Sequence, residues 1–424
     1  MLQEMLCEGL PCLYNENEAL VFSPYSRQLL VTAASKLKDG TLGEYLHEQG
    51  HIGTPVACAG TNTELQQLTI VLTSDCNLRC DYCFVKGGCS AEVISIHVIQ
   101  QAVDKSCVMA NKRGKRGLLV TFFGGEPTLE KDLIVQTVDY VREACANSGL
   151  VCKFGITTNG VCPESTLEYL IQENFFITVS TDGIPEVHDR HRHFPNGEPT
   201  SHILQKNLKF LAEREAKFLI RITCTADSVL QLPDAVKYFS GLGAQIIHIE
   251  AVSLAGRATE TKGSGMVLRP DADVFVESLI KSVETAKKCG VSIMNSAYMN
   301  ILVPSVHYCD GVGGNKLVVT YTGDYTTCLE VQDSCHPAKE WFLIGHSDGE
   351  KLNSSVFASK PIIETVPDCQ NCFAKYICAG GCPTRNFHME GDVYKVDEFR
   401  CKTTRSVLKY CMISLYNNIS KKGD

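Results

Sequence analysis

Tryptophan is almost missing from this chain, which has one in 424 residues, and aromatic residues make up only 8% of the total. No apolar run reaches the length needed to cross a bilayer, which argues against a membrane-spanning protein. The first twelve residues contain two glutamates and no basic residue, so they lack the charged start and apolar stretch of a secretory signal. We therefore expect a cytoplasmic protein.

An excess of positive charge is also missing. The formal net charge is −8, and acidic and basic residues are interspersed. The absence of a basic stripe argues against a nucleic-acid partner. Hydrophobic residues make up 44% and charged residues 21% of the chain, which is typical of a globular protein. A chain of this length predicts two or three domains.

Cysteine is abundant instead, with 22 in the chain. In a reducing compartment, cysteines serve as metal ligands or catalytic groups more often than as disulfides. They also serve as small buried apolar residues. Only some of these cysteines fall into ordered spacings, so we expect both uses here.

Strand-like and helix-like segments alternate from Leu68 onward. The predicted strands are Leu68–Leu72, Leu118–Phe123, Phe154–Thr158, Phe176–Ser180, Phe218–Cys224 and Ile246–Val252. The predicted helices are Val93–Met109, Leu133–Ala146, Glu164–Gln172, Ile203–Ala212, Pro233–Gly241 and Asp273–Lys288. Such alternation indicates parallel βα units. We predict an α/β fold with a partial (β/α)6 barrel, whose active-site residues lie at the C-terminal ends of the strands.

The segments on either side of this region have different patterns. In residues 1–65 we predict a short α+β unit, with strands at Cys12–Tyr14 and Ala19–Phe22 and helices at Ser26–Leu37 and Leu42–Gln49. After about residue 300 the helical pattern fades, and glycine-rich sequence with ordered cysteines follows. The predicted domains are therefore 1–65, 66–300 and 301–424, the last of them stabilised by metal.

The first ordered group is Cys76, Cys80 and Cys83, with the spacing C-x3-C-x2-C just beyond the first predicted strand. Three thiolates on one loop can each hold one iron of a 4Fe–4S cluster. The fourth iron then has no protein ligand, and an open coordination position is what catalysis requires of a metal. A zinc loop or a chance spacing are the alternatives for the isolated triplet.

A second motif follows one βα unit later, where a predicted strand runs into Gly124, Gly125, Glu126 and Pro127. Paired glycines let a ligand approach the backbone closely. We expect the Glu126 carboxylate to suit a ligand ammonium. Taken alone, this motif is also compatible with an ordinary turn between strand and helix.

Together, the cysteine triplet and the Gly-Gly-Glu-Pro motif resemble the radical S-adenosylmethionine (SAM) superfamily, from about Leu68 to the end of the chain. The resemblance implies that SAM chelates the open iron through its amino and carboxylate groups. One electron from the reduced cluster then cleaves SAM, and the resulting 5′-deoxyadenosyl radical abstracts a substrate hydrogen. This chemistry belongs to the cofactors, while the protein supplies position and excludes water.

The resemblance also implies which residues contact SAM. Ser180 and Asp182 should bind the ribose hydroxyls, since a carboxylate and a hydroxyl together offer a donor and acceptors. Arg221 is a candidate for the SAM carboxylate, although a salt bridge across the barrel is an equal alternative. The full predicted set is Tyr82, Gly124, Gly125, Glu126, Pro127, Asn159, Ser180, Asp182, Arg221, Val252 and Leu254.

A dense polar segment, residues 188–193, follows the fourth predicted strand with the sequence His-Asp-Arg-His-Arg-His. It resembles a stretch common in the same superfamily. It could position a peptide substrate, but our default expectation is a solvated loop.

Seven ordered cysteines follow in the C-terminal part of the chain: Cys309, Cys328, Cys369, Cys372, Cys378, Cys382 and Cys401. Their arrangement resembles the SPASM domain, which occurs on radical SAM enzymes that modify peptides and proteins. The resemblance implies two auxiliary 4Fe–4S clusters, and thus three clusters in all. One would be held by Cys369, Cys372, Cys378 and Cys401. The other would be held by Cys309, Cys328 and Cys382, with its fourth ligand either absent or supplied by Cys335. A zinc ribbon is the alternative.

Three functions fit these patterns. The first is a maturase that installs a thioether or other crosslink in a ribosomally made precursor peptide, with residues 1–65 either binding a leader peptide or capping the barrel. It would need a reductant such as flavodoxin or ferredoxin. The second is an anaerobic sulfatase maturase, although Leu329 stands where such enzymes place an aspartate after the second SPASM cysteine. The third is a non-enzymatic iron–sulfur or zinc-stabilised protein.

Overall fold

The computed structural model describes residues 2–55, 64–260, 267–297, 300–332, 335–349 and 351–420. The chain divides into two compact units. One comprises Asn62–Met294 and Gly314–Val356, and the other comprises Met1–Thr61, Asn295–Gly313 and Phe357–Asp424. None of the described helices is both long enough and apolar enough to span a bilayer.

The larger unit is built on one sheet of ten strands in the order β11-β10-β9-β8-β7-β6-β5-β12-β13-β14. Its parallel core consists of β5 (Leu65–Val71), β6 (Gly117–Phe123), β7 (Val151–Thr158), β8 (Phe176–Thr181), β9 (Phe218–Cys224) and β10 (Ile246–Ala251). β11 (Ser292–Met294) extends one end in parallel. β12 (Lys316–Val319) lies parallel to β5, and β13 (Asp324–Thr326) and β14 (Leu343–His346) follow antiparallel.

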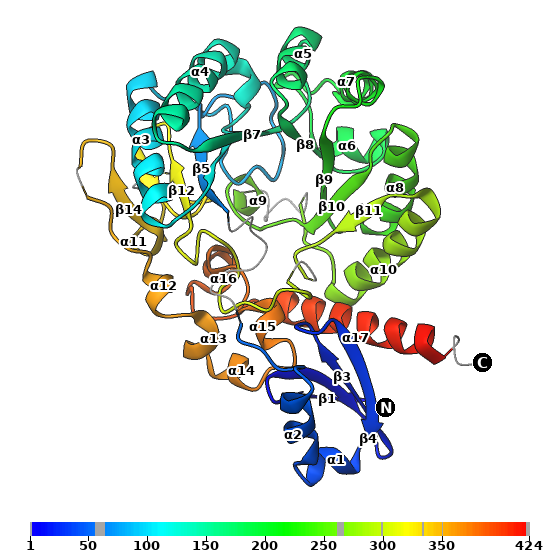
Figure 1. Ribbon diagram of the computed structural model, residues 1–424. Helices are drawn as coiled ribbons and strands as arrows, with labels where there is room; N and C mark the ends of the chain where they lie inside the picture. The colour runs from blue at the N-terminus through cyan, green and yellow to red at the C-terminus, as the bar shows by residue number, and fades with distance from the viewer. Residues whose placement is uncertain are drawn as a thin grey trace. The chain divides into compact units, whose positions relative to one another are not determined.

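Helices follow the parallel strands and lie on the outer side of the curved sheet (Figure 1). They are α3 (Ile96–Lys112), α4 (Lys131–Asn147), α5 (Glu164–Gln172), α6 (Pro185–His191), α7 (Ser201–Glu213), α8 (Leu232–Gly241) and α10 (Ala272–Cys289). Short elements complete the unit: α9 (Arg257–Glu260), α11 (Lys339–Phe342) and the 3-10 turns η1 (Pro127–Glu130) and η2 (Val229–Gln231). The predicted α/β class, with its βα units and parallel sheet, is confirmed.

Alternation along the strands explains why this sheet has two different faces. In β9 and β10, Ile220, Ile222, Ile247 and Ile249 are 0% exposed. The residues between them include Arg221 and His248, and successive strand residues point to opposite faces. The isoleucines therefore form the core beneath the helices, and the polar residues lie on the inner face of the sheet.

The smaller unit begins with an antiparallel sheet of β1 (Gln3–Cys7), β2 (Leu10–Tyr14), β3 (Glu18–Ser23) and β4 (Gln28–Ala33). α1 (Ser35–Lys38) and α2 (Thr41–Glu48) follow it. The predicted helix at Ser26–Leu37 is wrong over most of its length. Its β-branched residues Val31 and Thr32 pair with Leu20 and Ala19 of β3, so ladder hydrogen bonds override the helical pattern.

The rest of this unit is helical. It contains α12 (Val356–Ser359), α13 (Ile362–Thr365), α14 (Pro367–Gln370), α15 (Lys375–Cys378), α16 (Pro383–Glu390) and α17 (Glu398–Ser420). The expectation that helices fade after residue 300 is therefore wrong. The 23 residues of α17 escape the periodicity argument because polar Thr403 and Thr404 are buried where an apolar stripe would be expected.

One apolar core joins the two ends of the chain within the smaller unit. Leu13, Leu20 and Phe22 from the N-terminal sheet pack together with Cys378, Leu408 and Met412. All six are at most 8% exposed. The N-terminal sheet is therefore part of the support for the C-terminal cysteine segment. The functional boundaries 1–65, 66–300 and 301–424 stay a prediction.

Candidate active site

The cysteine triplet lies on the loop that follows β5, at the C-terminal end of the parallel strands. Cys80 is buried, and Cys76 and Cys83 are partly buried. Backbone amides point at two of the sulfur atoms, from Leu78 to Cys76 Sγ and from Gly87 to Cys83 Sγ, each at 3.4 Å. Amide donors of this kind stabilise a thiolate.

Burial also makes these thiols poor thiolates unless a cation is present. Burial, with a smaller contribution from neighbouring anionic groups, raises the pKa of Cys76 and of Cys80 to about 12. Iron would supply the compensating positive charge. Among the described residues, no three His, Cys, Asp or Glu side chains are arranged to hold a single metal ion. A cluster has a different requirement, because each thiolate binds a separate iron.

Two arginines hold the backbone of this loop, which we call the cluster loop (residues 74–89). Arg79 Nη1 donates to the carbonyls of Cys76 and Leu78 at 2.6 and 2.9 Å. Arg257 Nε donates to the carbonyl of Cys80 at 2.9 Å, and its own amide donates to the carbonyl of Cys83 at 3.0 Å. The loop is thus fixed through its main chain, which leaves the sulfur atoms available for metal.

The Gly-Gly-Glu-Pro motif lies against the cluster loop. A Cβ placed on Gly125 would come within 2.0 Å of the Asp75 carbonyl oxygen. The amides of Gly125 and Glu126 donate to the carbonyls of Thr73 and Asp75, both at 2.8 Å. The glycines therefore allow close approach of the chain to itself, where sequence reasoning expected the approach of a ligand.

Glu126 is 1% exposed, and its carboxylate is bound by the protein. Oε1 accepts from the Thr128 and Thr158 hydroxyls at 2.6 and 2.7 Å, and Oε2 accepts from the backbone amide of Asn159 at 2.7 Å. Burial raises its pKa, although these hydrogen bonds oppose the change. Its oxygens tie the ends of β6 and β7 together, and the expectation that this carboxylate binds a ligand ammonium stays a prediction.

The end of β8 provides a buried polar group of the kind that SAM requires. Tyr82 OH and Arg192 Nε both donate to Asp182 Oδ1, the latter at 2.8 Å. Asp182 is 1% exposed, and its Oδ2 has no hydrogen-bond partner among the described residues. A buried acceptor without a donor is costly, so this oxygen suits a ligand hydroxyl.

Arg192 keeps its charge inside this cluster. Burial alone would lower the pKa of Arg192, but Asp182 and Tyr82 raise it well above its usual value. The guanidinium also lies 5.4 Å from the centre of the Tyr82 ring. Arg192 therefore joins the cluster loop to the end of β8.

Other predicted SAM contacts gather nearby in the same unit. Tyr82 and Val252 belong to one apolar cluster, against which Leu254 packs. Asn159 Nδ2 donates to Asn77 Oδ1 at 2.8 Å and lies 3.9 Å from Cys76 Sγ. Ser180 and Arg221 are register partners on β8 and β9. Pro127 begins the 3-10 turn η1 directly after Glu126 and is buried, and its contact with SAM stays a prediction.

The segment 188–193 is not the solvated loop that we expected. Residues up to His191 form α6, and His188, His191 and Arg192 are at most 7% exposed. His191 Nδ1 and His193 Nε2 lie 3.0 and 3.3 Å from the carboxylate of Asp81. The segment is ordered because its histidines contact the cluster loop. Its position directly after the strand that ends near Asp182 is the feature of the sequence that could have indicated this role.

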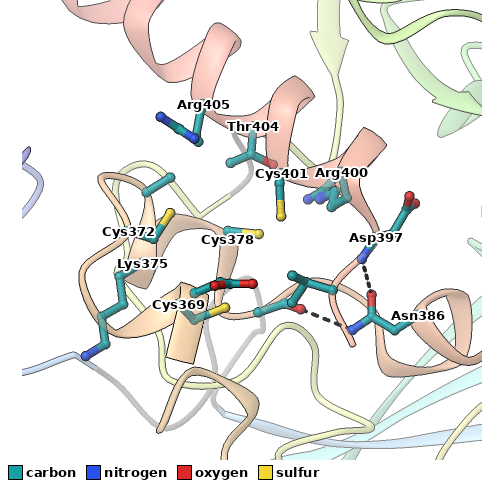
Figure 2. Close-up of a pocket in the computed structure, with 14 residues that line it drawn as sticks. Cys369, Cys372, Lys375, Cys378, Asn386, Asp397, Arg400, Cys401, Thr404 and Arg405 are labelled. Carbon is teal, nitrogen blue, oxygen red and sulfur yellow. Dashed lines mark hydrogen bonds between the residues drawn. The ribbon is translucent and has the colours of Figure 1, made fainter. Parts of the chain in front are cut away.

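A second group of thiols lines a cavity in the smaller unit. Cys369, Cys372, Cys378 and Cys401 point their sulfur atoms toward one space, and Arg400 and Arg405 border it (Figure 2). Burial raises the pKa of Cys369 and Cys401 to about 12, and the nearby thiols add to the effect. Cys369 and Cys378 are buried, and Cys372 and Cys401 are partly buried. Four sulfurs around one cavity are the donor set of a closed 4Fe–4S site.

Polar contacts fix the surroundings of this cavity. Asn386 Nδ2 donates to the Gly380 carbonyl at 3.3 Å, and its Oδ1 accepts from the Asp397 amide at 3.2 Å (Figure 2). Arg405 donates to Glu4 Oε2 of β1 at 2.5 Å through Nη2. The N-terminal strand thus reaches the helix that carries Cys401.

The remaining predicted ligands are divided between the units. Cys309 and Cys382 belong to the smaller unit, and Cys328 belongs to the larger one. Cys309 and Cys335 are exposed. A cluster held by Cys309, Cys328 and Cys382 stays a prediction.

The comparisons with known proteins agree with this geometry. Residues 70–197 match the family model described as the radical SAM superfamily. The cysteine triplet, Glu126 and Asp182 all lie within that range. This part of the chain is therefore similar to the radical SAM superfamily, and the similarity favours a SAM-dependent enzyme over the non-enzymatic alternative.

Relatives with named activities are distant. A cysteine-type anaerobic sulfatase-maturating enzyme of Clostridium novyi is 26% identical over 179 residues, which are 41% of this chain and 48% of that enzyme. The structure of anSMEcpe with bound AdoMet and Cp18Cys peptide aligns with a TM-score of 0.68 at 19% identity, covering 84% of this chain and 99% of that one. Streptococcus suis SuiB bound to precursor peptide SuiA aligns with a TM-score of 0.54 at 15% identity, covering 94% and 100%.

Sequence reasoning missed several residues of this site. Arg192 and Arg257 were not predicted, because nothing in a single sequence shows that a distant arginine reaches the cluster loop. His248 and Glu250 were also missed. They alternate with Ile247 and Ile249 in a parallel strand, and this alternation signals an inner polar face that the sequence analysis did not use.

Proposed function

We propose that this radical SAM enzyme modifies a ribosomally made precursor peptide, installing a thioether or another crosslink. The observation that carries the proposal is the cavity lined by Cys369, Cys372, Cys378 and Cys401 in the same chain as the SAM site. A second cluster at that cavity gives the enzyme an electron acceptor, which a crosslinking oxidation requires. SuiB, which is bound to a precursor peptide in its solved structure, has the same fold.

In this proposal, Cys76, Cys80 and Cys83 hold a 4Fe–4S cluster, and Asp182 Oδ2 accepts a hydrogen bond from a ribose hydroxyl of SAM. Tyr82, Val252 and Leu254 exclude water from the adenosyl end. When bound, SAM and the cluster supply the 5′-deoxyadenosyl radical that removes a substrate hydrogen. The chain's own contribution is to orient the substrate and to receive its proton. The electron source would be a flavodoxin or ferredoxin.

The test is anaerobic incubation of the reconstituted full chain with SAM, dithionite and cysteine-containing short peptides encoded beside its gene. The proposal predicts 5′-deoxyadenosine together with a peptide that has lost two hydrogen atoms and no longer alkylates at cysteine. Formation of 5′-deoxyadenosine with every such peptide left unchanged would contradict it.

Formylglycine formation is the second candidate, favoured by the similarity to the sulfatase-maturating enzyme of Clostridium novyi. Leu329 follows Cys328, so this chain lacks a carboxylate at that position, although Glu330 comes next. A sulfatase-derived peptide distinguishes the two functions. Replacement of its cysteine sulfur by a carbonyl oxygen would support formylglycine formation over crosslinking.

A further inference from the structure

Three polar residues lie side by side on the inner face of the parallel sheet. The register pairs Arg221 of β9 with His248 of β10, and pairs Thr223 with Glu250. His248 and Glu250 are two positions apart, so they share one face of β10. Their side chains are 15% and 9% exposed, which is unusually buried for ionisable groups.

Hydrogen bonds fix the state of the imidazole between its two neighbours. Arg221 Nη1 lies 3.5 Å from His248 Nδ1, and His248 Nε2 lies 3.1 Å from Glu250 Oε1. A guanidinium only donates, so we assign His248 Nδ1 as the acceptor and place the proton on Nε2, where Glu250 accepts it. The arrangement is an imidazole with one basic nitrogen, supported from behind by a carboxylate.

We propose that His248 is the proton acceptor for substrate oxidation and that Glu250 is the positioning residue that orients it. The inference rests on the proposed function and adds the group that takes the proton. A carboxylate behind an imidazole fixes its tautomer and stabilises the imidazolium that forms. The proposal requires that Arg221, the candidate for the SAM carboxylate, turns away from Nδ1 when SAM binds, so that the basic nitrogen is exposed.

When bound, SAM would supply a 5′-deoxyadenosyl radical, and loss of one hydrogen atom to it would leave a carbon radical on the substrate. Formation of the crosslink then releases one proton from the substrate and one electron. The proton goes to His248 Nδ1, and the electron goes to an iron–sulfur cluster of the kind that the four-cysteine cavity suits. His248 later returns its proton to solvent.

His248 differs from His97, His188 and His191 of the same unit because it lies on the inner face of the sheet and is held by Arg221 and Glu250. His188 contacts the hydroxyls of Thr181 and Thr200, and His191 contacts Asp81 of the cluster loop. His97 is exposed on α3 and bonds only to Gln101 of the same helix among the contacts found. His97 therefore offers a matched control, because the same substitution there changes a histidine on the outside of the barrel.

The test compares His248→Gln, Glu250→Gln, Glu330→Gln and His97→Gln in the full holoenzyme, with a peptide that the wild-type enzyme modifies. The first measurement is the amount of crosslinked peptide formed for each 5′-deoxyadenosine released. We expect His248→Gln to lower this ratio by about 100-fold, the usual contribution of a general base. Glu250→Gln should lower it less, and His97→Gln and Glu330→Gln should leave it unchanged.

Two further measurements separate a base from a structural role. SAM affinity, measured by equilibrium dialysis, should be the same in His248→Gln and wild type. Added imidazole should restore crosslinking to His248→Ala, since a small base can occupy the vacated space. The inference would be overturned if His248→Gln left the ratio of crosslinked peptide to 5′-deoxyadenosine unchanged. It would also be overturned if Glu330→Gln were the one variant that lowered this ratio. Failure of the wild-type enzyme to modify any peptide would instead contradict the proposed function.

Discussion

Tyr82 donates its hydroxyl hydrogen bond to Asp182, which joins the cluster loop to the end of β8 across 100 residues of sequence. Both side chains are at most 7% exposed. The bond uses Oδ1 of Asp182 and leaves Oδ2 for a ligand. The cluster loop and the predicted ribose site therefore depend on each other through this pair.

Replacing Tyr82 by Phe keeps the ring and removes this bond. We expect the free energy of unfolding to fall by about 1–3 kcal/mol, because Asp182 loses a buried donor. SAM should also bind more weakly, since Asp182 is less firmly held. Chemical denaturation and equilibrium dialysis of the anaerobic protein measure the two effects.

Tyr140→Phe is the matched control for that change. The Tyr140 hydroxyl also donates to an aspartate, Asp104, at 2.9 Å, but the pair is exposed on α3 and α4. Loss of the Tyr140–Asp104 hydrogen bond should lower the free energy of unfolding by less than about 0.5 kcal/mol. Equal effects of the two substitutions would show that burial of the Tyr82–Asp182 pair is unimportant.

His188 makes stability depend on pH. It is 0% exposed, lies 2.9 Å from Thr181 Oγ1 and 3.0 Å from Thr200 Oγ1, and its pKa is lowered to about 4 by burial. Below pH 6.5 the His188 imidazole is protonated in the unfolded chain, whereas in the folded chain it stays neutral until the pH is near 4. Stability should therefore fall by up to about 1.4 kcal/mol per pH unit in that window.

Pulse proteolysis in urea at pH 7.5 and 5.5 measures this dependence. His188→Gln should lower stability at both values and reduce the difference between them, because the titrating group is gone. His97→Gln should keep the wild-type difference. If His188→Gln leaves the pH dependence intact, another group is responsible for it.

The N-terminal sheet should be needed for iron in the C-terminal segment. Phe22 is 3% exposed in the core that contains Cys378. Phe22→Ala should therefore lower the free energy of unfolding by about 3–5 kcal/mol. We expect less iron bound at the four-cysteine cavity, measured as iron per chain in a variant that also lacks Cys76, Cys80 and Cys83. Val31→Ala removes a side chain that is 44% exposed on β4 and should change neither quantity.

The periodicity of apolar residues predicted the parallel strands and their helices, because each strand is buried against a helix on one face. It failed at β4, where pairing with β3 outweighs local preference, and at α17, where buried Thr403 and Thr404 interrupt the apolar stripe. The cysteine groups could be predicted because their spacing in the sequence is itself the pattern of a metal site. The protein contacts of Glu126 could not be predicted, because no sequence pattern shows that Thr158 and Asn159 reach its carboxylate.

The most direct test is SAM cleavage by the anaerobically reconstituted, dithionite-reduced protein, compared with a variant in which Cys76, Cys80 and Cys83 are all Ala. We predict that the wild-type protein releases 5′-deoxyadenosine and that the variant releases none, while it still binds iron at Cys369, Cys372, Cys378 and Cys401. Release of 5′-deoxyadenosine by the variant at the wild-type rate would contradict the assignment of the active site.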